Sequence, residues 1–457
     1  MADNKLLELE SAVLDKLSGK VNLILPQEER ERIVFAALNE VSGDLQRKVI
    51  PQELDALKSE EEKRKFVRNF LSYGIVEELL CDSEVEDIII NSLNHIYIHH
   101  AQKGLLRTDK RFTSQAELDI FARKILLLSG RTSMRKISNL ELPNMQGRVN
   151  VCVSPLGTQI TITKAKVEPL SIIDLIERGS LNFTLAGQLW LYVEGMSVRP
   201  ANLIIAGATG TGKTTLLNAI LSFVPGNERM VIIEDTLELN TALYDSCSRL
   251  ESDEDLSMEE LVKNSLRMRP DRVIVGEVRG AEAKDLMTVV NIGKNCLGTI
   301  HASSSREAIL RLQNEPMNVP EILVNLVDVF IITRKFQVKG KVYRAVEEVS
   351  ETGGMEQKTV LLSQTWKYDF EHSQLKEVSP STIYRDRLAK ATGLTARQIM
   401  DEVKVRARIL EVMAQKRMNS IKEISAFCQL YNRDNDGALV RLGLNKRNLL
   451  AQVSRNL

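Results

Sequence analysis

Nine consecutive residues have the composition and spacing of a loop that wraps around phosphate. They are Gly207, Ala208, Thr209, Gly210, Thr211, Gly212, Lys213, Thr214 and Thr215. Glycines let the backbone approach an anion closely, and the N–H groups at the start of a helix point toward the phosphates. Lys213 should reach the β- and γ-phosphates of ATP, and the Thr214 hydroxyl should bind Mg²⁺. The pattern predicts a nucleotide-binding site that uses ATP and Mg²⁺.

Acidic and imidazole side chains follow three further short apolar runs, at 230–233, 272–275 and 298–300. Glu234 and Glu238 follow the first run. Glu277 follows the second run, and His301 follows the third. If the runs are parallel strands, their carboxyl ends meet at the sheet edge that carries the phosphate loop. One carboxylate would then help to hold Mg²⁺, another would orient or deprotonate the attacking water, and His301 would register the γ-phosphate.

Each of these side chains also has a purely structural interpretation. An acid that ends a strand is often a helix cap, and a lone histidine is often a satisfied core residue. Because all three groups recur at the same topological position, we favour the catalytic interpretation.

Two regions of the chain are expected to have α/β structure, and the second of them would position these groups. A buried-strand run at 203–206 enters the phosphate loop, and a helix-compatible run at 215–221 leaves it. From about residue 169 to about residue 363, strands alternate with helices, as in a doubly wound sheet. The sequence thus predicts an α/β fold for this part of the chain.

The N-terminal part has a charge-rich segment with helical periodicity up to about residue 70, and then a mixed α/β region. We expect strands at 85–91, 95–99, 148–153 and 159–163, and a helix at 111–128 capped by Thr113 or Ser114. Residues 166–170 form the expected linker, and the chain is expected to be helical from Ser379 onward.

The composition is that of a soluble globular protein: 457 residues, 43% hydrophobic, 27% charged, with a formal net charge of zero. No apolar run is long enough to cross a membrane, and the N-terminus lacks the features of a signal peptide. We therefore expect a cytoplasmic protein. Five cysteines without C-x-x-C spacing indicate neither a zinc site nor a disulfide framework. His95, His99 and His100 cluster around an apparent strand without suitable partner ligands, which favours surface histidines over a metal site.

The four segments described above resemble the sequence boxes of one family. The chain is similar to the hexameric ATPases of the type II/type IV secretion superfamily, and most similar to the archaeal branch that assembles type IV pilus-like filaments and the archaellum. The family's Walker A box corresponds to residues 207–215 of this chain, and its aspartate box to 232–239. The family's Walker B box corresponds to 266–283 with Glu277, and the end of its histidine box to 299–312. N-terminal and C-terminal segments extend the resemblance.

The resemblance implies a RecA-like P-loop ATPase core with an N-terminal α/β domain and helical N- and C-terminal segments. The implied division is 1–70, 71–168, 169–370 and 371–457. It also implies a homohexamer at the inner face of the cell membrane that pushes a polytopic platform protein and so assembles a pilin-like filament. Within the aspartate box, it slightly favours Glu238 over Glu234 as the group that activates water.

An arginine from a neighbouring subunit often completes the site in ring ATPases. Arg148 is the first choice for this role in the N-terminal lobe, followed by Arg131 and Arg135. The core candidates, which could instead form structural ion pairs, are Arg267, Arg269 and Arg279. The chain departs from the family where the histidine box opens with Lys294 in place of histidine, and where Lys164 stands near the position of a family arginine.

Two other functions remain open at this point. The segment from Thr382 to the end has a net charge of +8, which is compatible with a nucleic-acid translocase or helicase. Aromatic residues make up only 5% of the chain, and acids are interspersed among the bases, so we favour a helical module with a solvated basic face and expect no direct nucleic-acid partner. Lys294 motivates the other alternative, a nucleotide-gated scaffold without turnover.

Overall fold

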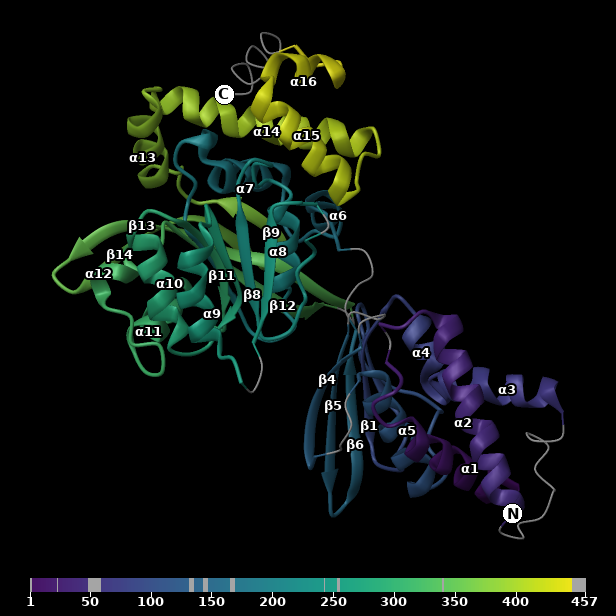
Figure 1. The fold of residues 1–457 in the computed structure, drawn as a ribbon. Coiled ribbons are helices and arrows are strands. Elements are labelled where there is room, and N and C mark those ends of the chain that lie inside the picture. The colour runs from purple at the N-terminus through teal and green to yellow at the C-terminus, as the bar shows by residue number, and fades with distance from the viewer. Residues whose placement is uncertain are drawn as a thin grey trace. The chain divides into compact units, whose positions relative to one another are not determined.

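The computed structural model describes residues 2–22, 24–47, 59–130, 135–142, 147–164, 169–241, 243–252, 255–338 and 341–445. The chain divides into two compact units (Figure 1). The N-terminal unit comprises Met1–Val167 with Lys339–Val342. The second unit, which we call the ATPase unit because it carries the segments that resemble the Walker A and Walker B boxes, comprises Glu168–Val338 with Tyr343–Leu457. Among the described residues, none of the helices is both long enough and apolar enough to cross a bilayer.

The N-terminal unit is built on a six-stranded antiparallel sheet with the order β3-β2-β1-β6-β5-β4. The strands are β1 Val85–Asn91, β2 Tyr97–His100, β3 Gly104–Arg107, β4 Ile137–Leu142, β5 Gly147–Ser154 and β6 Gly157–Thr163. The helices are α1 Ala2–Leu17, α2 Gln27–Arg47, α3 Glu60–Leu71, α4 Glu77–Cys81 and α5 Gln115–Leu128. Alternate residues of β6, such as Ile160 and Ile162, are buried in a core that includes the apolar face of α5.

The helix expected at 111–128 starts four residues later than expected, at Gln115. Ser114 has an extended backbone, and its side chain accepts a hydrogen bond from the backbone N–H of Glu117. Glu117 in turn accepts hydrogen bonds from the N–H and hydroxyl of Thr113. This reciprocal capping keeps the preceding residues out of the helix. Of the two expected caps, Thr113 and Ser114, the structure has Ser114.

The ATPase unit contains a nine-stranded sheet with the order β15-β14-β13-β12-β7-β11-β10-β8-β9. Its strands are β7 Leu203–Gly207, β8 Met230–Glu234, β9 Cys247–Glu251, β10 Arg272–Val278, β11 Asn295–Ile300, β12 Val329–Val338, β13 Lys341–Glu356, β14 Thr359–Asp369 and β15 Gln374–Glu377. The six strands from β12 to β9 in this order run parallel. They form the parallel, helix-covered α/β core that the sequence predicts.

Helices cover both faces of the parallel strands, so these strands are buried on both sides. Alternate residues of β7, such as Leu203 and Ile205, contact a core that includes α7 Phe183–Glu194 and α8 Lys213–Leu221. Their neighbours, such as Ile204, contact a core on the other face. That core includes α9 Met258–Ser265, α10 Glu282–Asn291 and α11 Ser305–Gln313. Burial on both faces explains why the strands read as uninterrupted apolar runs.

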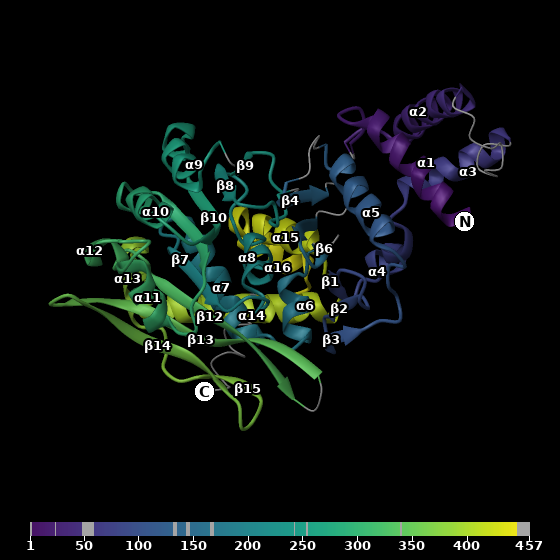
Figure 2. The same ribbon diagram turned by 90° about the horizontal axis from the view of Figure 1, so that it is seen from below.

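The expected alternation of strands and helices up to residue 363 is wrong beyond β12. Three strands, β13, β14 and β15, follow one another there. β14 pairs antiparallel with both β13 and β15, and short turns connect these three strands (Figure 2). Turns of this length allow hairpins but exclude a crossover helix. The result is an antiparallel extension of the sheet at one edge.

The C-terminal helices belong to the ATPase unit and lie over α7 (Figure 1). They are α13 Ile383–Thr392, α14 Ala396–Gln415, α15 Ile421–Arg433 and α16 Asn435–Arg441. The buried Arg406 of α14 bonds Glu194 at 2.6 Å, and its guanidinium lies over the rings of both Trp190 and Tyr431. On the same helix α7, Gln188 accepts a hydrogen bond of 2.7 Å from the indole N–H of Trp366.

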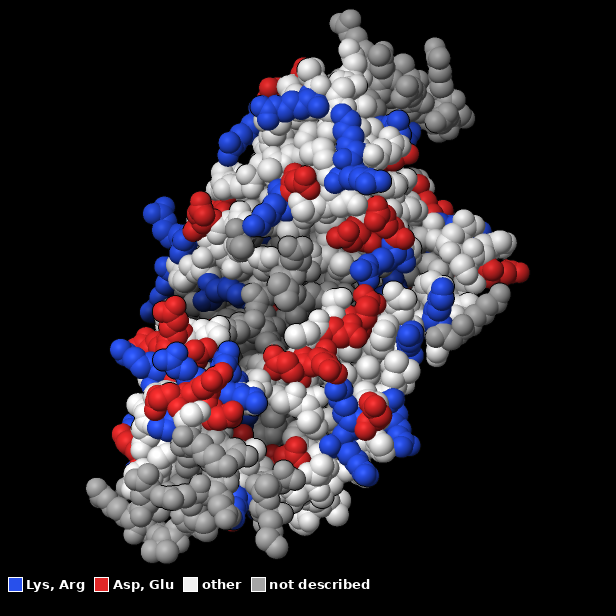
Figure 3. Space-filling model, turned by 90° about the vertical axis from the view of Figure 1, so that its right-hand side faces the viewer, with Lys and Arg blue, Asp and Glu red and all other residues white. Residues whose placement is uncertain are grey.

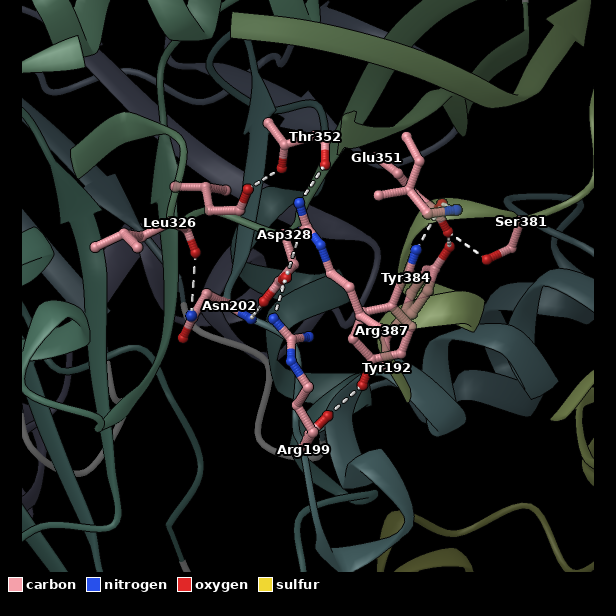
Figure 4. Close-up of polar contacts among 12 residues, drawn as sticks. Tyr192, Arg199, Asn202, Leu326, Asp328, Glu351, Thr352, Ser381, Tyr384 and Arg387 are labelled. Carbon is pink, nitrogen blue, oxygen red and sulfur yellow. Dashed lines mark hydrogen bonds and ion pairs between the residues drawn. The ribbon is translucent and has the colours of Figure 1, made fainter. Parts of the chain in front are cut away.

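A buried carboxylate joins α13 to the parallel sheet (Figure 4). Asp328, at the start of β12, is 2% exposed. It accepts hydrogen bonds from Arg387 of α13 at 2.9 Å and from Arg199 at 3.0 Å. It also accepts one from the backbone N–H of Asn202, at the start of β7, at 3.0 Å. Two arginines and a backbone donor satisfy this buried charge, and they tie the C-terminal helices to the amino ends of the strands.

Candidate nucleotide-binding site

The phosphate loop connects the central strand β7 to helix α8. Gly210 and Gly212 have positive φ angles of 72° and 95°, which glycine adopts without strain. A Cβ atom on Gly207 would come within 2.4 Å of the hydroxyls of Thr211 and Thr333, so no larger residue fits there. The N-terminus of α8 carries Lys213, whose ammonium group bonds the carbonyl of Ala208 at 3.2 Å. The loop thus has the form of an anion cradle at a helix N-terminus.

The carboxyl ends of four parallel strands meet at this sheet edge, as expected. β11 lies next to β7 and leads into His301, β10 follows with Glu277, and β8 ends at Glu234. Burial lowers the pKa of Lys213, while the nearby carboxylates of Glu277 and Glu238 act in the opposite direction. Lys213 is therefore in the electrostatic field of both acidic groups. The cradle, the lysine and the acids fit a triphosphate with its Mg²⁺ ion.

Glu234 and Glu238, which the sequence leaves as competitors, have different surroundings. Glu234 is 1% exposed, and its carboxylate accepts hydrogen bonds from the backbone N–H groups of Glu238 and Leu239 at 2.8 and 2.9 Å. Arg249 lies 3.3 Å from its other oxygen. Burial raises the pKa of Glu234. Its contacts hold the loop that bears Glu238, whereas the Glu238 side chain is half-buried.

The residue before Glu277 is Gly276, and its neighbours explain why a glycine is needed there. A Cβ atom at this position would lie 3.0 Å from the Cγ atom of Glu234 on the adjacent strand. The Thr299 hydroxyl also donates a hydrogen bond of 2.6 Å to the Gly276 carbonyl. The glycine thus leaves room for the buried Glu234 side chain. The hydrogen bond from Thr299 holds the strand in place immediately before Glu277.

Arg279 joins two acidic groups of the site. Its guanidinium bonds Glu277 at 2.6 Å and Asp235 at 2.8 Å. The structure therefore places Arg279 in an ion pair within the chain, the alternative that the sequence left open. Arg267 and Arg269 are exposed.

His301 lies immediately after β11 and is half-buried. It borders a pocket of about 450 Å³ together with Arg279 and Arg311. Helix α11 begins four residues later, and Glu307 in its first turn bonds the Ser303 hydroxyl and, at 2.7 Å, its N–H. These contacts lower the pKa of Glu307 to about 2. They also fix the short segment that connects His301 to α11.

The remaining residues singled out from the sequence lie elsewhere. Arg148 is on β5 and Arg135 precedes β4, both in the N-terminal unit, while Arg131 lies outside the described residues. Lys164 in the same unit donates hydrogen bonds to the carbonyls of Leu79 and Asp82. Lys294 precedes β11, at the end of the strand opposite to His301.

Two contacts of the site were missed by the sequence analysis. Arg344 of β13 donates a hydrogen bond of 2.8 Å to the carbonyl of Gly210 in the phosphate loop. Asn218 of α8 bonds the backbone of the loop that bears Glu238. Nothing in the sequence around Arg344 signals its contact. Asn218 interrupts an apolar run from Leu216 to Leu221, which was a usable signal of a buried polar role.

Relatives of the chain include two archaeal proteins and a protein of a type IV secretion system. An uncharacterized protein of Methanocaldococcus jannaschii is 31% identical over 375 residues, which cover 77% of this chain and 67% of that protein. Another protein of this archaeon is 37% identical, over 48% of this chain and 32% of its own length. The type IV secretion system protein VirB11 of Bartonella quintana is 28% identical, over 46% of this chain and 63% of its own length.

The solved structures similar to this chain include the ATPase DotB of Yersinia pseudotuberculosis. It is 17% identical, with a TM-score of 0.47, over 78% of this chain and 92% of that chain. The sequence profile described as Type II/IV secretion system protein matches residues 70–447. This match covers most of the chain and confirms the resemblance drawn from the four sequence boxes. The chain belongs to the type II/IV secretion system protein family.

Proposed function

We propose that this chain is an ATP-hydrolysing motor. The observation that carries the proposal is the meeting of the phosphate loop, Glu277 and the Glu238 loop at one edge of one parallel sheet. Lys213 lies in the field of both carboxylates. A nucleotide-binding site alone requires only the cradle, whereas hydrolysis also requires groups that act on the metal and on water.

The roles of the residues follow from their chemistry. The N–H groups of the loop and Lys213 would hold the phosphates, and the Thr214 hydroxyl and Glu277 would hold Mg²⁺. The ion would neutralise charge that develops on the transferred phosphoryl group. Glu238 would orient or deprotonate the attacking water, and Glu234 would keep its loop in place. His301 would detect the γ-phosphate from the end of β11.

The motor would act as a homohexamer at the inner face of the cell membrane. Arg148 of one subunit would complete the site of its neighbour, and the cycle of ATP binding and hydrolysis would push a polytopic platform protein. The work would drive secretion or the assembly of a pilin-like filament, including filaments of the archaellum type. Family membership supports this proposal, as does the name of the Bartonella quintana relative, a type IV secretion system protein.

The contacts of the C-terminal helices support a structural role for their basic residues. Arg387, Arg397, Arg406 and Arg408 each pair with a carboxylate of the ATPase unit. On the face drawn in Figure 3, basic and acidic side chains are interspersed. A nucleic-acid groove would need unpaired cations along a continuous track. We therefore propose no second function for this segment.

The experiment compares ATP binding and phosphate release of the full chain with those of two variants. Lys213→Ala should lose both affinity and turnover, because it removes the phosphate counter-charge. Glu277→Gln should bind ATP but lose hydrolysis by a factor of about 10² or more. A wild-type protein that binds ATP and releases no phosphate would be a nucleotide-gated scaffold and would refute the motor. Wild-type turnover in Glu277→Gln would refute the role given to that residue.

A further inference from the structure

Asn218 is a buried polar residue on the helix that follows the phosphate loop. It is 8% exposed, and its neighbours in α8, Leu217 and Ala219, belong to the hydrophobic core. Asparagine is a poorer helix former than the residues around it, because its side chain competes for backbone hydrogen bonds. A residue of this kind inside a buried helix is expected to have specific partners.

Both partners of Asn218 are backbone groups of the loop after β8. Its amide nitrogen donates a hydrogen bond of 3.2 Å to the carbonyl of Glu238. Its amide oxygen accepts one of 2.8 Å from the N–H of Asn240. A carbonyl only accepts and an N–H only donates, so these two partners determine which end of the amide is which.

The loop is therefore held from two elements at once. Glu234 holds it from strand β8 through the N–H groups of Glu238 and Leu239. Asn218 holds it from helix α8, whose first residues, Lys213 and Thr214, belong to the phosphate loop. Asn218 lies five residues after Lys213, which is about 7.5 Å along the helix axis. The same rigid helix thus connects the phosphate cradle to the backbone of Glu238.

We propose that Asn218 is a positioning residue that sets the distance between the bound nucleotide and the water-activating Glu238. The proposal rests on the proposed function, because it assumes that Glu238 acts on the attacking water. Glu234 holds the conformation of the loop, and Asn218 fixes the position of the loop relative to the bound phosphates. Hydrolysis needs both, since a small misplacement of a catalytic group slows a reaction strongly.

The test uses two substitutions in the full chain. Asn218→Asp keeps the acceptor for Asn240 but places a carboxylate oxygen against the Glu238 carbonyl. Asn218→Ala removes both hydrogen bonds and, because alanine is the best helix former, keeps α8 intact. Both variants should lower kcat by about tenfold or more. ATP and ADP affinities should stay within about twofold of the wild-type values, because the phosphate cradle is unchanged.

Asn202 supplies a matched control within the same unit. Its side chain makes the same pair of bonds, donating to the Leu326 carbonyl at 3.1 Å and accepting from the Cys296 N–H at 2.9 Å. Figure 4 shows the bond to Leu326. Asn202 precedes β7, so it lies at the strand ends opposite to the phosphate loop. Asn202→Ala should lower thermal stability and leave kcat unchanged, which separates positioning from a general loss of stability.

A double substitution and hydrogen exchange complete the test. In a Glu238→Gln background, Asn218→Ala should lower kcat no further, because the group that it positions is already lost. Amide exchange of residues 238–240 should be faster in Asn218→Ala than in wild type, whether or not ATP is hydrolysed. Unchanged exchange, or a kcat equal to that of wild type, would overturn the proposal. An inactive wild-type protein would instead refute the proposed function.

Discussion

At the scale of single residues, burial separates two glutamates that have the same chemical group. Glu234 has its carboxylate inside the protein, where it accepts backbone hydrogen bonds. The backbone N–H of Glu238 donates one of those bonds, whereas its side chain is half-buried near Lys213. A carboxylate that is already engaged with backbone donors is a poor base for a water molecule, because its lone pairs are occupied.

Glutamine substitution should therefore affect the two positions differently. The amide oxygen of Glu234→Gln can still accept the N–H bonds of Glu238 and Leu239, so we expect a fall in kcat of less than about tenfold. Glu238→Gln removes the carboxylate that we propose as the base and should lower kcat by about 10² or more. Phosphate release at saturating ATP measures both effects. The reverse ranking would assign the water-activating role to Glu234.

At the scale of the elements, the strand ends show what the sequence could predict. Strands buried on both faces read as apolar runs, and the polar residue after each run marks its carboxyl end, so the candidate site could be placed from sequence. The antiparallel strands β13 and β14 have mixed burial and lack this signal. The contacts of Asn218 and Arg344 join residues 20 and 134 positions apart. Only the folded chain brings such partners together.

The start of helix α11 allows a test of how a carboxylate charge stabilises the fold at different pH values. The hydrogen bonds from Ser303 hold the pKa of Glu307 at about 2, below its ordinary value of 4.5. A depressed carboxylate pKa stabilises the folded state above pH 4.5, and this stabilisation is lost as the pH falls toward 2. Glu307→Gln should therefore lower Tm by about 1–2 °C at pH 7. The difference from wild type should shrink below pH 4.5.

Glu321→Gln is the matched control for this prediction. Glu321 lies in the first turn of α12 Glu321–Val324, and no hydrogen bond of its side chain is seen within the described residues. Its substitution should leave Tm nearly unchanged at both pH values. If the Glu307→Gln difference stays constant from pH 7 to pH 3, the carboxylate charge does not stabilise the start of α11.

At the scale of the whole molecule, the proposed ring makes the neighbour's arginine a requirement for each site. Arg148→Ala and Lys213→Ala should each be inactive alone, since one lacks the completing arginine and the other lacks the cradle lysine. Mixed rings should regain activity, because an Arg148→Ala chain can receive Arg148 from a Lys213→Ala neighbour. In an equal mixture, about one quarter of the sites would be complete.

Two measurements check this arrangement. Phosphate release should appear when the two inactive proteins are allowed to exchange subunits, and the specific activity of wild type should rise with protein concentration as rings form. A mixture that stays inactive, together with a wild-type activity per chain that is flat from dilute solution upward, would show that each site is complete within one chain.

The packing of α7 gives the chain an unevenly distributed optical signal. Its two tryptophans are Trp190 and Trp366, and both belong to the ATPase unit. One indole is stacked on Phe223 and lies under the Arg406 guanidinium, and the other is bonded to Gln188. Intrinsic tryptophan emission therefore reports how the C-terminal helices are seated on α7, while the N-terminal unit contributes none. A thermal melt followed by tryptophan emission reports the unfolding of the ATPase unit, and circular dichroism is needed to follow the N-terminal unit.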